Sequence, residues 1–336
     1  MDKSTAVTFD YSKAAGLLSK AFINNRTHLL FEQESLSSLW SLLFKENVPL
    51  VPEVMLAEKI EQKAFDTFLS QYTYFLNKFD NPPLVLVDFL KCYEIENLKV
   101  IIDSLCSGET KLPLLLDLKS FSKIKVENWP DLQKMTKGTC YEWLKEIPSI
   151  ENQQKTEFAL DMFLFQENWK AVNSCKGENQ AAHKELFLDE YIIKNILWAL
   201  RLKIYYEMPN EQIIENLFYI DAPKKSDLVA GPAIKVLDFE IDRYSDWKDW
   251  KYAKYLNPQE NGYSWRVDPT WIERRYMAHQ AKFANHVFHS NPMEDVALAA
   301  WFKIKNYELT CIRTAVESIR LSVDSQEAME AVGVNG

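Results

Sequence analysis

The chain has 336 residues, a formal charge of −9 and only 8 glycines. A glycine content of roughly 7% would give about 24, so the sequence argues against folds built on glycine-rich phosphate loops or many tight turns and favours an all-helical fold. The acidic balance argues against a general nucleic-acid-binding protein, which needs a basic surface. The length exceeds what one compact core usually fills, so we expect two or three lobes.

The five cysteines are scattered, and no two of them form a CxxC pair. This pattern indicates free thiols in a reducing cytosol rather than a disulfide framework or a zinc site. The opening residues carry no apolar stretch of the kind found in a signal peptide. The most apolar windows, 83–90 and 112–116, are far shorter than the ~20 residues that span a bilayer. We therefore expect no transmembrane helix, and membrane contact only through partners.

Apolar residues recur at helical spacing along most of the chain. The helix predicted over 83–106 runs without a break and stops at Ser107-Gly108. The stretch 223–232 is the best candidate for a linker, because it contains proline, glycine and several polar residues. The tail over 324–336 is small, polar and acidic and is expected to fray. The predicted helices cover about 11–18, 36–43, 56–75, 83–106, 158–169, 178–207, 210–218, 268–289 and 292–323.

Three of the long predicted helices share an internal repeat. Segments 94–101, 192–199 and 308–315 can be aligned so that two positions, three residues apart, are aliphatic in every copy. Asn97 recurs as Asn195, and the acid–base pair Glu94/Lys99 recurs as Glu308/Arg313. Helical solenoid repeats are much shorter than this spacing. We therefore predict three similar lobes, each built around one long helix, over 8–115, 116–225 and 226–323, followed by the frayed tail.

Two segments around this repeat resemble a known family. Residues 88–103 (DFLKCYEIENLKVIID) and 301–321 (WFKIKNYELTCIRTAVESIRL) are similar to the C subunit of archaeal and bacterial A/V-type ATPases, whose eukaryotic relative is the d subunit of the vacuolar proton pump. The residues that match the family's two motifs are Glu94, Ile95, Asn97, Leu98 and Lys99, and then Glu308, Leu309, Ile312 and Arg313. Cys311 stands where the family usually has Asn, and the middle copy departs further, with Ile192 and Leu197 in the acidic and basic positions.

The resemblance implies an all-α, three-lobed funnel with approximate three-fold pseudosymmetry. In that family the funnel lies on the ring of proteolipid subunits of the membrane sector, at the cytoplasmic face, and receives the foot of the central stalk formed by the D and F subunits. It is peripheral and monomeric within a larger complex, has no catalytic site, cofactor or metal, and couples ATP hydrolysis or synthesis to ion transport. The identity of the ion and the direction of coupling depend on the proteolipid.

The motif residues are the candidate contact residues. Glu94 with Lys99, and Glu308 with Arg313, are five residues apart, which is not an ideal spacing for an ion pair within one helix. Contact between lobes and contact with the stalk are both open explanations. The residues predicted to make such contacts are Glu94, Asn97, Lys99, Asn195, Glu308 and Arg313.

Two alternative functions come from other classes of protein. The sequence lacks GxxxxGK[ST], GxGxxG, GxSxG and HExxH. His279, His286 and His289 fall within roughly an 80° arc of one predicted helix, so an all-helical metal-dependent enzyme could use them with Glu273. His279 lies two turns from His286, and surface or inter-lobe histidines are the simpler interpretation. A free-standing adaptor that binds amphipathic peptides is the other alternative.

Two further segments could carry a site. Acidic residues over 238–249 occupy five positions of a calcium-loop count, but Arg243 stands where the turn requires glycine, so a solvated turn is favoured. The segment 244–276 is rich in tryptophan and tyrosine. Such rings can fill a lobe core, present a partner surface or contact lipid.

Overall fold

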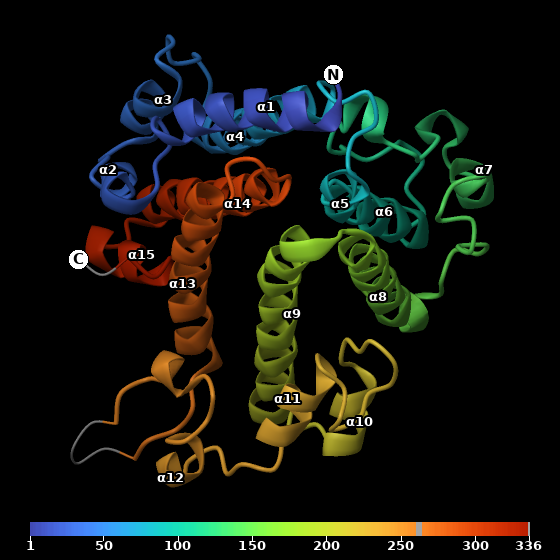
Figure 1. The fold of residues 1–336 in the computed structure, drawn as a ribbon, viewed down its shortest axis with the longest axis vertical. Coiled ribbons are helices and arrows are strands. Elements are labelled where there is room, and N and C mark those ends of the chain that lie inside the picture. Colours follow the sequence, from blue (N-terminus) through green and yellow to red (C-terminus); the bar gives the residue numbers. More distant parts are fainter. Residues whose placement is uncertain (260–263, 335–336) are drawn as a thin grey trace. The chain divides into compact units, whose positions relative to one another are not determined.

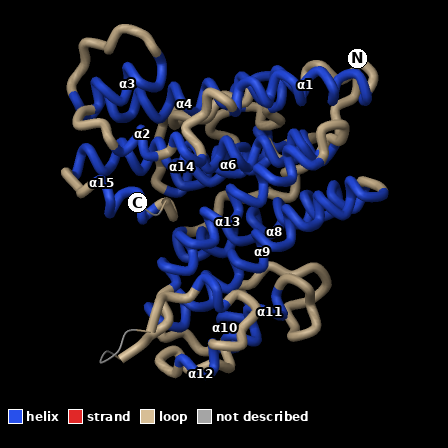
Figure 2. The backbone as a smooth tube through the Cα atoms, turned by 60° about the vertical axis from the view of Figure 1, so that its left-hand side comes forward, coloured by secondary structure: helices blue, strands red, loops and turns tan. Residues whose placement is uncertain are grey.

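The computed structural model describes residues 1–259 and 264–334, and over this part of the chain it contains helices and loops but no strand (Figure 2). The all-helical fold predicted from the low glycine content and the helical spacing is therefore confirmed. Within the same described ranges, no helix combines the length and the apolarity needed to cross a bilayer.

The chain divides into two compact units. The continuous unit is Pro82–Lys176, and the two-segment unit joins Met1–Asn81 to Gly177–Gly336. The three-lobe division over 8–115, 116–225 and 226–323 stays a prediction.

In the two-segment unit, the long helix α14 (Val296–Leu321) is the central element. It packs against α1 (Lys3–Leu18), α4 (Glu53–Leu76), α9 (Gly177–Tyr205) and α13 (Pro269–Ser290) (Figure 1). Its first turns are rich in alanine and fully buried, so neighbouring helices can approach closely.

Apolar side chains from both ends of the chain share one core in this unit. Leu39 and Ile60 pack in the same cluster as Cys311 and Ala315 of α14. Burying such side chains stabilises the fold by about 1.5–3 kcal/mol each. The smaller elements that close this core are η1 (Asn24–Arg26), α2 (His28–Phe31), α3 (Leu36–Phe44) and α15 (Ser325–Ala331).

A second core of the two-segment unit forms around α9. Ile196 and Leu200 of α9 pack with Ile272 and Tyr276 of α13 and with Trp247. Helices α9 and α13 lie side by side in Figure 1. The short elements around this core are α10 (Asn210–Glu215), α11 (Ala230–Val236), α12 (Tyr244–Trp247) and η4 (Ala253–Tyr255).

The continuous unit is built on two long helices, α6 (Lys91–Cys106) and α8 (Ile150–Ser174), which pack against each other. Its core contains Ile95 and Leu98 of α6, Leu160 of α8, and Tyr141 from the loop between them. The other elements of this unit are α5 (Leu84–Asp88), η2 (Lys119–Phe121), η3 (Val126–Asn128) and α7 (Leu132–Thr136).

The expectation of an unbroken helix over 83–106 is wrong. Helix α5 ends at Asp88 and α6 begins at Lys91, while the stop at Ser107-Gly108 is as predicted. At the break, the backbone N–H of Leu90 bonds to the carbonyl of Val87, three residues back, instead of to the residue four back. Asp88 is buried there and pairs with Lys91 at 2.8 Å.

The stretch 223–232 is a packed turn rather than a linker. The carboxylate of Asp227 accepts hydrogen bonds of 2.9–3.1 Å from four backbone N–H groups, those of Ile220, Asp221, Val229 and Ala230. Burial alone would raise the pKa of Asp227, but these hydrogen bonds hold the pKa below its usual value. Val229 and Ala230 are fully buried. Composition alone did not reveal that one carboxylate organises the turn.

The tail also differs from its expected frayed state. Ser325–Ala331 form α15, and the Asp324 side chain caps this helix by accepting from the N–H groups of Gln326 and Glu327. Ala328 and Val332 are buried, and the hydroxyl of Tyr307 donates to the carbonyl of Val332 at 3.0 Å. The tail docks because Ala328 of a capped helix and Val332 directly after that helix are both buried.

Candidate functional site

Asn97 and Asn195 perform the same structural task in two copies of the repeat. The Asn97 side chain donates to the carbonyl of Leu116 at 2.9 Å and accepts from its N–H at 2.8 Å. The Asn195 side chain makes the same pair of bonds with Phe218, both at 2.8 Å, and donates also to the carbonyl of Val229 at 3.1 Å. Both amides are buried, so each clamps a later loop in place of a backbone partner, the loop after α6 for Asn97 and the loop after α10 for Asn195.

Glu94 and Glu308 form a second recurring clamp. The buried carboxylate of Glu94 accepts from the backbone N–H groups of Lys123 and Ile124 and from the hydroxyl of Tyr141 at 2.9 Å. Burial raises the pKa of Tyr141, and the neighbouring Glu94 carboxylate raises it further, so the phenol stays a donor. Glu308 accepts a hydrogen bond from the backbone N–H of Phe22, 286 positions earlier in the chain, and pairs with Lys305.

The basic residues of the repeat tie their helices to a neighbouring helix. The Lys99 ammonium lies 2.7 Å from Asp161 of α8, and the Arg313 guanidinium lies 3.2 Å from Glu61 of α4. Lys99 is half-buried, whereas the side chain of Arg313 is 73% exposed. An exposed pair contributes little to stability, so Arg313 is the motif residue most available to a partner.

The motif residues therefore do not pair with each other, and the contacts described here stay inside one compact unit. Sequence reasoning found these residues from their recurrence but could not find their partners. In the first two copies the loop and helix partners follow the motif, whereas in the third copy Glu308 and Arg313 also reach residues among the first 81 of the chain. The role of the six residues in contact with other subunits stays a prediction.

Two of the three departures from the repeat, Cys311 and Leu197, can be followed in the structure. Cys311, in the Asn position, is fully buried in an apolar cluster, where burial raises the pKa of its thiol to about 12. Leu197, in the basic position, is also buried. One turn later, Arg201 makes the helix-to-helix ion pair instead, at 2.7 Å from Glu273 of α13. The middle copy thus keeps an ion pair but moves it by four residues.

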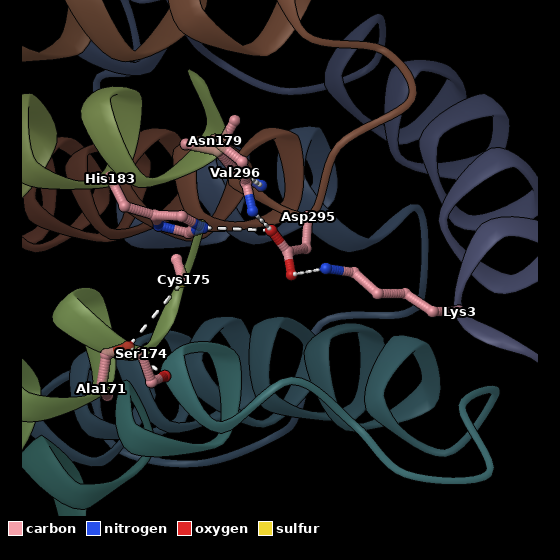
Figure 3. Close-up of polar contacts among 8 residues, drawn as sticks. All are labelled: Lys3, Ala171, Ser174, Cys175, Asn179, His183, Asp295 and Val296. Carbon is pink, nitrogen blue, oxygen red and sulfur yellow. Dashed lines mark hydrogen bonds and ion pairs between the residues drawn. The ribbon is translucent and has the colours of Figure 1, made fainter. Parts of the chain in front are cut away.

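Sequence reasoning missed a buried polar centre around Asp295. Figure 3 shows Lys3, Asn179 and His183 converging on this carboxylate. His183 lies at 3.2 Å and Asn179 at 2.5 Å from one oxygen, and Lys3 lies at 2.7 Å from the other. Burial alone would raise the pKa of Asp295, but His183 and Lys3 hold it well below its usual range. These residues come from three helix starts far apart in the sequence, which is why no motif revealed them.

The histidines of α13 do not form a metal site. His286 and His289 are exposed, and His279 is half-buried beside Lys254 at 3.3 Å. Glu273, the carboxylate considered with them, is engaged by Arg201. Across the described residues, no three His, Cys, Asp or Glu side chains are grouped so that they could hold a metal ion.

The other two candidate segments are structural where they are described. Asp238 pairs with Lys225 at 2.6 Å, and Asp246 accepts from the N–H of Glu240 at 3.3 Å, as a solvated turn would. Trp247 and Trp265 are buried in the core around α9. Residues 260–263 of the aromatic segment lie outside the described residues.

Comparison with known proteins agrees with the motif resemblance. A family model described as ATP synthase (C/AC39) subunit matches residues 12–331. The chain is also 23% identical, over 331 residues, to an uncharacterized protein of Treponema pallidum (strain Nichols), and the match covers 95% of this chain and 94% of that one. The family match confirms the similarity to the C subunit of A/V-type ATPases inferred from the two motif segments.

Proposed function

We propose a function from the family to which this chain belongs, that of the ATP synthase C/AC39 subunits. In this proposal the chain is the non-catalytic central-stalk subunit of a V/A-type ATPase. It joins the rotating D and F subunits to the proteolipid ring at the cytoplasmic face of the membrane. It couples ATP hydrolysis to ion transport, or ion flow to ATP synthesis.

The observation that carries this proposal is the family match over nearly the whole chain. The recurring clamps support it physically. A coupling subunit has to transmit rotation without deforming, and close-packed interiors resist deformation. Here buried side chains of Glu94, Asn97, Asn195 and Glu308 fix loops and distant segments onto long helices. Each of these bonds is costly to break, because breaking it leaves a buried polar group without a partner.

A second support is the way the two ends of the chain are joined. Residues before position 65 and residues after position 306 share one core, and Arg313 pairs with Glu61 across two long helices. A force applied to α14 is therefore passed to α4 and α1 through packed side chains rather than through a flexible connection.

The experiment is a pull-down of the tagged full-length chain from detergent-solubilised membranes, with the recovered proteins identified by mass. We expect the D and F subunits and the proteolipid in the eluate. Recovery of the chain without any of them contradicts the proposal. Elemental analysis of the same eluate separates the alternatives, because a stoichiometric transition metal would support the metal-dependent enzyme instead.

A further inference from the structure

A basic cavity lies beside α13, apart from the clamps described above. It has a volume of about 480 Å³, is open to solvent on one side, and is lined by residues of α13, η4 and α15 and by the segment after α15. This volume falls within the ~300–1,000 Å³ of typical small-molecule sites. The lining carries four permanent cations, Lys254, Arg274, Arg275 and Lys282.

The charge of the cavity is unbalanced. Glu330 is the carboxylate in its lining, so four cations face one acid, although the whole chain has a net charge of −9. Among the described residues, none of the four cations lies within 4.0 Å of a carboxylate. Two of them contact only neutral groups, since Lys254 lies 3.3 Å from His279 and Arg275 lies over the ring of Trp271.

The neighbouring histidine responds to this positive field. Burial lowers the pKa of His279, and Lys254 and Lys282 lower it further, while Asp189 of α9 acts in the opposite direction. The imidazole is thus kept neutral, and it carries no negative charge that could offset the four cations of the cavity. Gathering cations that repel one another is unfavourable unless an anion joins them.

The wall of the cavity is built by close backbone packing. Gly333 has a φ of +75°, and a Cβ atom at this position would collide with the backbone oxygen of Arg274 and with Ala278. The segment after α15 is therefore seated directly on α13, and Val332 beside it is buried. The backbone around the cavity is therefore closely packed, while Lys254, Arg275 and Lys282 are exposed and can be reached by a soluble ligand.

We propose that this cavity binds a phosphate-bearing anion. Phosphate concentrates two or more negative charges in a small volume, which matches four cations around one cavity. The planar guanidinium groups of Arg274 and Arg275 suit paired phosphate oxygens, and Lys254 and Lys282 supply compact charges. The phosphate comes either from a soluble phosphate compound or from the headgroup of an anionic lipid.

The test is a calorimetric titration of the full-length protein with inorganic pyrophosphate at constant ionic strength. We expect saturable binding of one pyrophosphate per chain. Arg274→Gln and Lys282→Gln should each weaken the affinity about tenfold, because each removes one charged hydrogen-bond donor. Lys251→Gln is the matched control, since Lys251 is exposed on the same segment as Lys254 but does not line the cavity.

A melting curve of each variant shows that the fold is retained, and Lys282, being exposed, is the substitution least able to disturb it. No saturable binding overturns the proposal. Equal weakening by Lys251→Gln also overturns it, because the binding is then an adventitious ionic attraction only.

Cosedimentation with phosphatidylcholine vesicles, with and without phosphatidylglycerol, identifies the source of the phosphate. A lipid headgroup is assigned if the protein binds the vesicles that contain phosphatidylglycerol, if pyrophosphate displaces it from them, and if Lys282→Gln weakens this binding. Pyrophosphate binding without vesicle binding assigns a soluble compound. The proposal is overturned if the protein binds no pyrophosphate and if Lys282→Gln leaves the binding to vesicles unchanged.

Discussion

Glu308 accepts a hydrogen bond of 2.6 Å from the backbone N–H of Phe22 and thereby joins two residues that are 286 positions apart. The same carboxylate pairs with Lys305 one turn earlier on α14. The bond connects the last long helix of the chain to the loop after the first one, in the core that both ends of the chain share. Glu308 is buried, so loss of its charge leaves the Lys305 ammonium without a counter-charge in a poorly solvated position.

Glu308→Gln should lower the free energy of unfolding by about 1–3 kcal/mol. The amide keeps an acceptor for the Phe22 N–H but leaves the Lys305 ammonium without its counter-charge. Urea denaturation followed by circular dichroism measures the change. Glu317→Gln on the same helix is the control, since Glu317 forms a solvent-exposed pair with Arg320 and its loss should cost less than about 1 kcal/mol. Equal effects of the two substitutions would show that the buried clamp adds no stability.

Asn195→Ala should destabilise the protein more than Asn97→Ala. Asn195 satisfies three backbone groups, and Asn97 satisfies two. Each buried group left without a partner costs about 1–3 kcal/mol. Asn152→Ala is a control at an exposed asparagine. Thermal unfolding of the three variants gives the order, and a reversed order between Asn195→Ala and Asn97→Ala contradicts the clamp interpretation.

Asp10→Asn should stabilise the protein at pH 8 and have little effect at pH 4. Asp10 is fully buried in α1, and neither of its carboxylate oxygens has a hydrogen-bond partner among the described residues. Burial raises the pKa of Asp10 to about 7 from the ordinary 3.8, although Lys78 and Lys13 act against this rise. The folded state therefore holds a proton that the unfolded state releases between these two values.

The sign of the pH dependence follows from that proton. Because the unfolded state binds fewer protons between about pH 4 and pH 7, the stability of the natural chain falls as the pH rises through this window. An amide at position 10 does not ionise, so the variant lacks this loss. Melting temperatures of both proteins from pH 4 to pH 8 measure it, and parallel curves would refute the prediction.

Arg313→Glu should weaken recovery of the stalk subunits in the pull-down while leaving the melting temperature nearly unchanged. The Arg313 side chain is exposed, so its pair with Glu61 contributes less than about 1 kcal/mol to stability. The substitution reverses a charge that a partner subunit can reach. Arg320→Glu, on the same helix, is the control. Undiminished recovery with Arg313→Glu would remove this residue from the partner surface.

The sequence predicted three of the long helices closely, because their apolar stripes recur over five or more turns, but it placed α8 (Ile150–Ser174) only over 158–169. Helices α4, α9 and α13 lie where the spacing placed them. The prediction from the sequence failed where a single side chain determines the local structure. Asp227 turns a polar stretch into a packed turn, and the buried Asp88 marks a break in an apolar run that reads as a single helix.

The candidate contact residues could be found from the sequence, but their partners could not. Recurrence of Glu94 as Glu308, and of Asn97 as Asn195, identified the positions without any structure. The partners are mostly backbone groups, which have no sequence signature, as with the N–H of Phe22. The Asp295 centre combines residues from three separate helices, and no spacing rule connects them.

The core shared by both ends of the chain has a consequence for biosynthesis. Helices α1 to α4 leave the ribosome long before α14 has been translated, so the apolar surface that they bury against α14 has no partner during most of synthesis. The continuous unit over Pro82–Lys176 contains its own core and can acquire structure while the rest is still being made. The nascent amino-terminal segment therefore has to be shielded from aggregation until the final helices emerge.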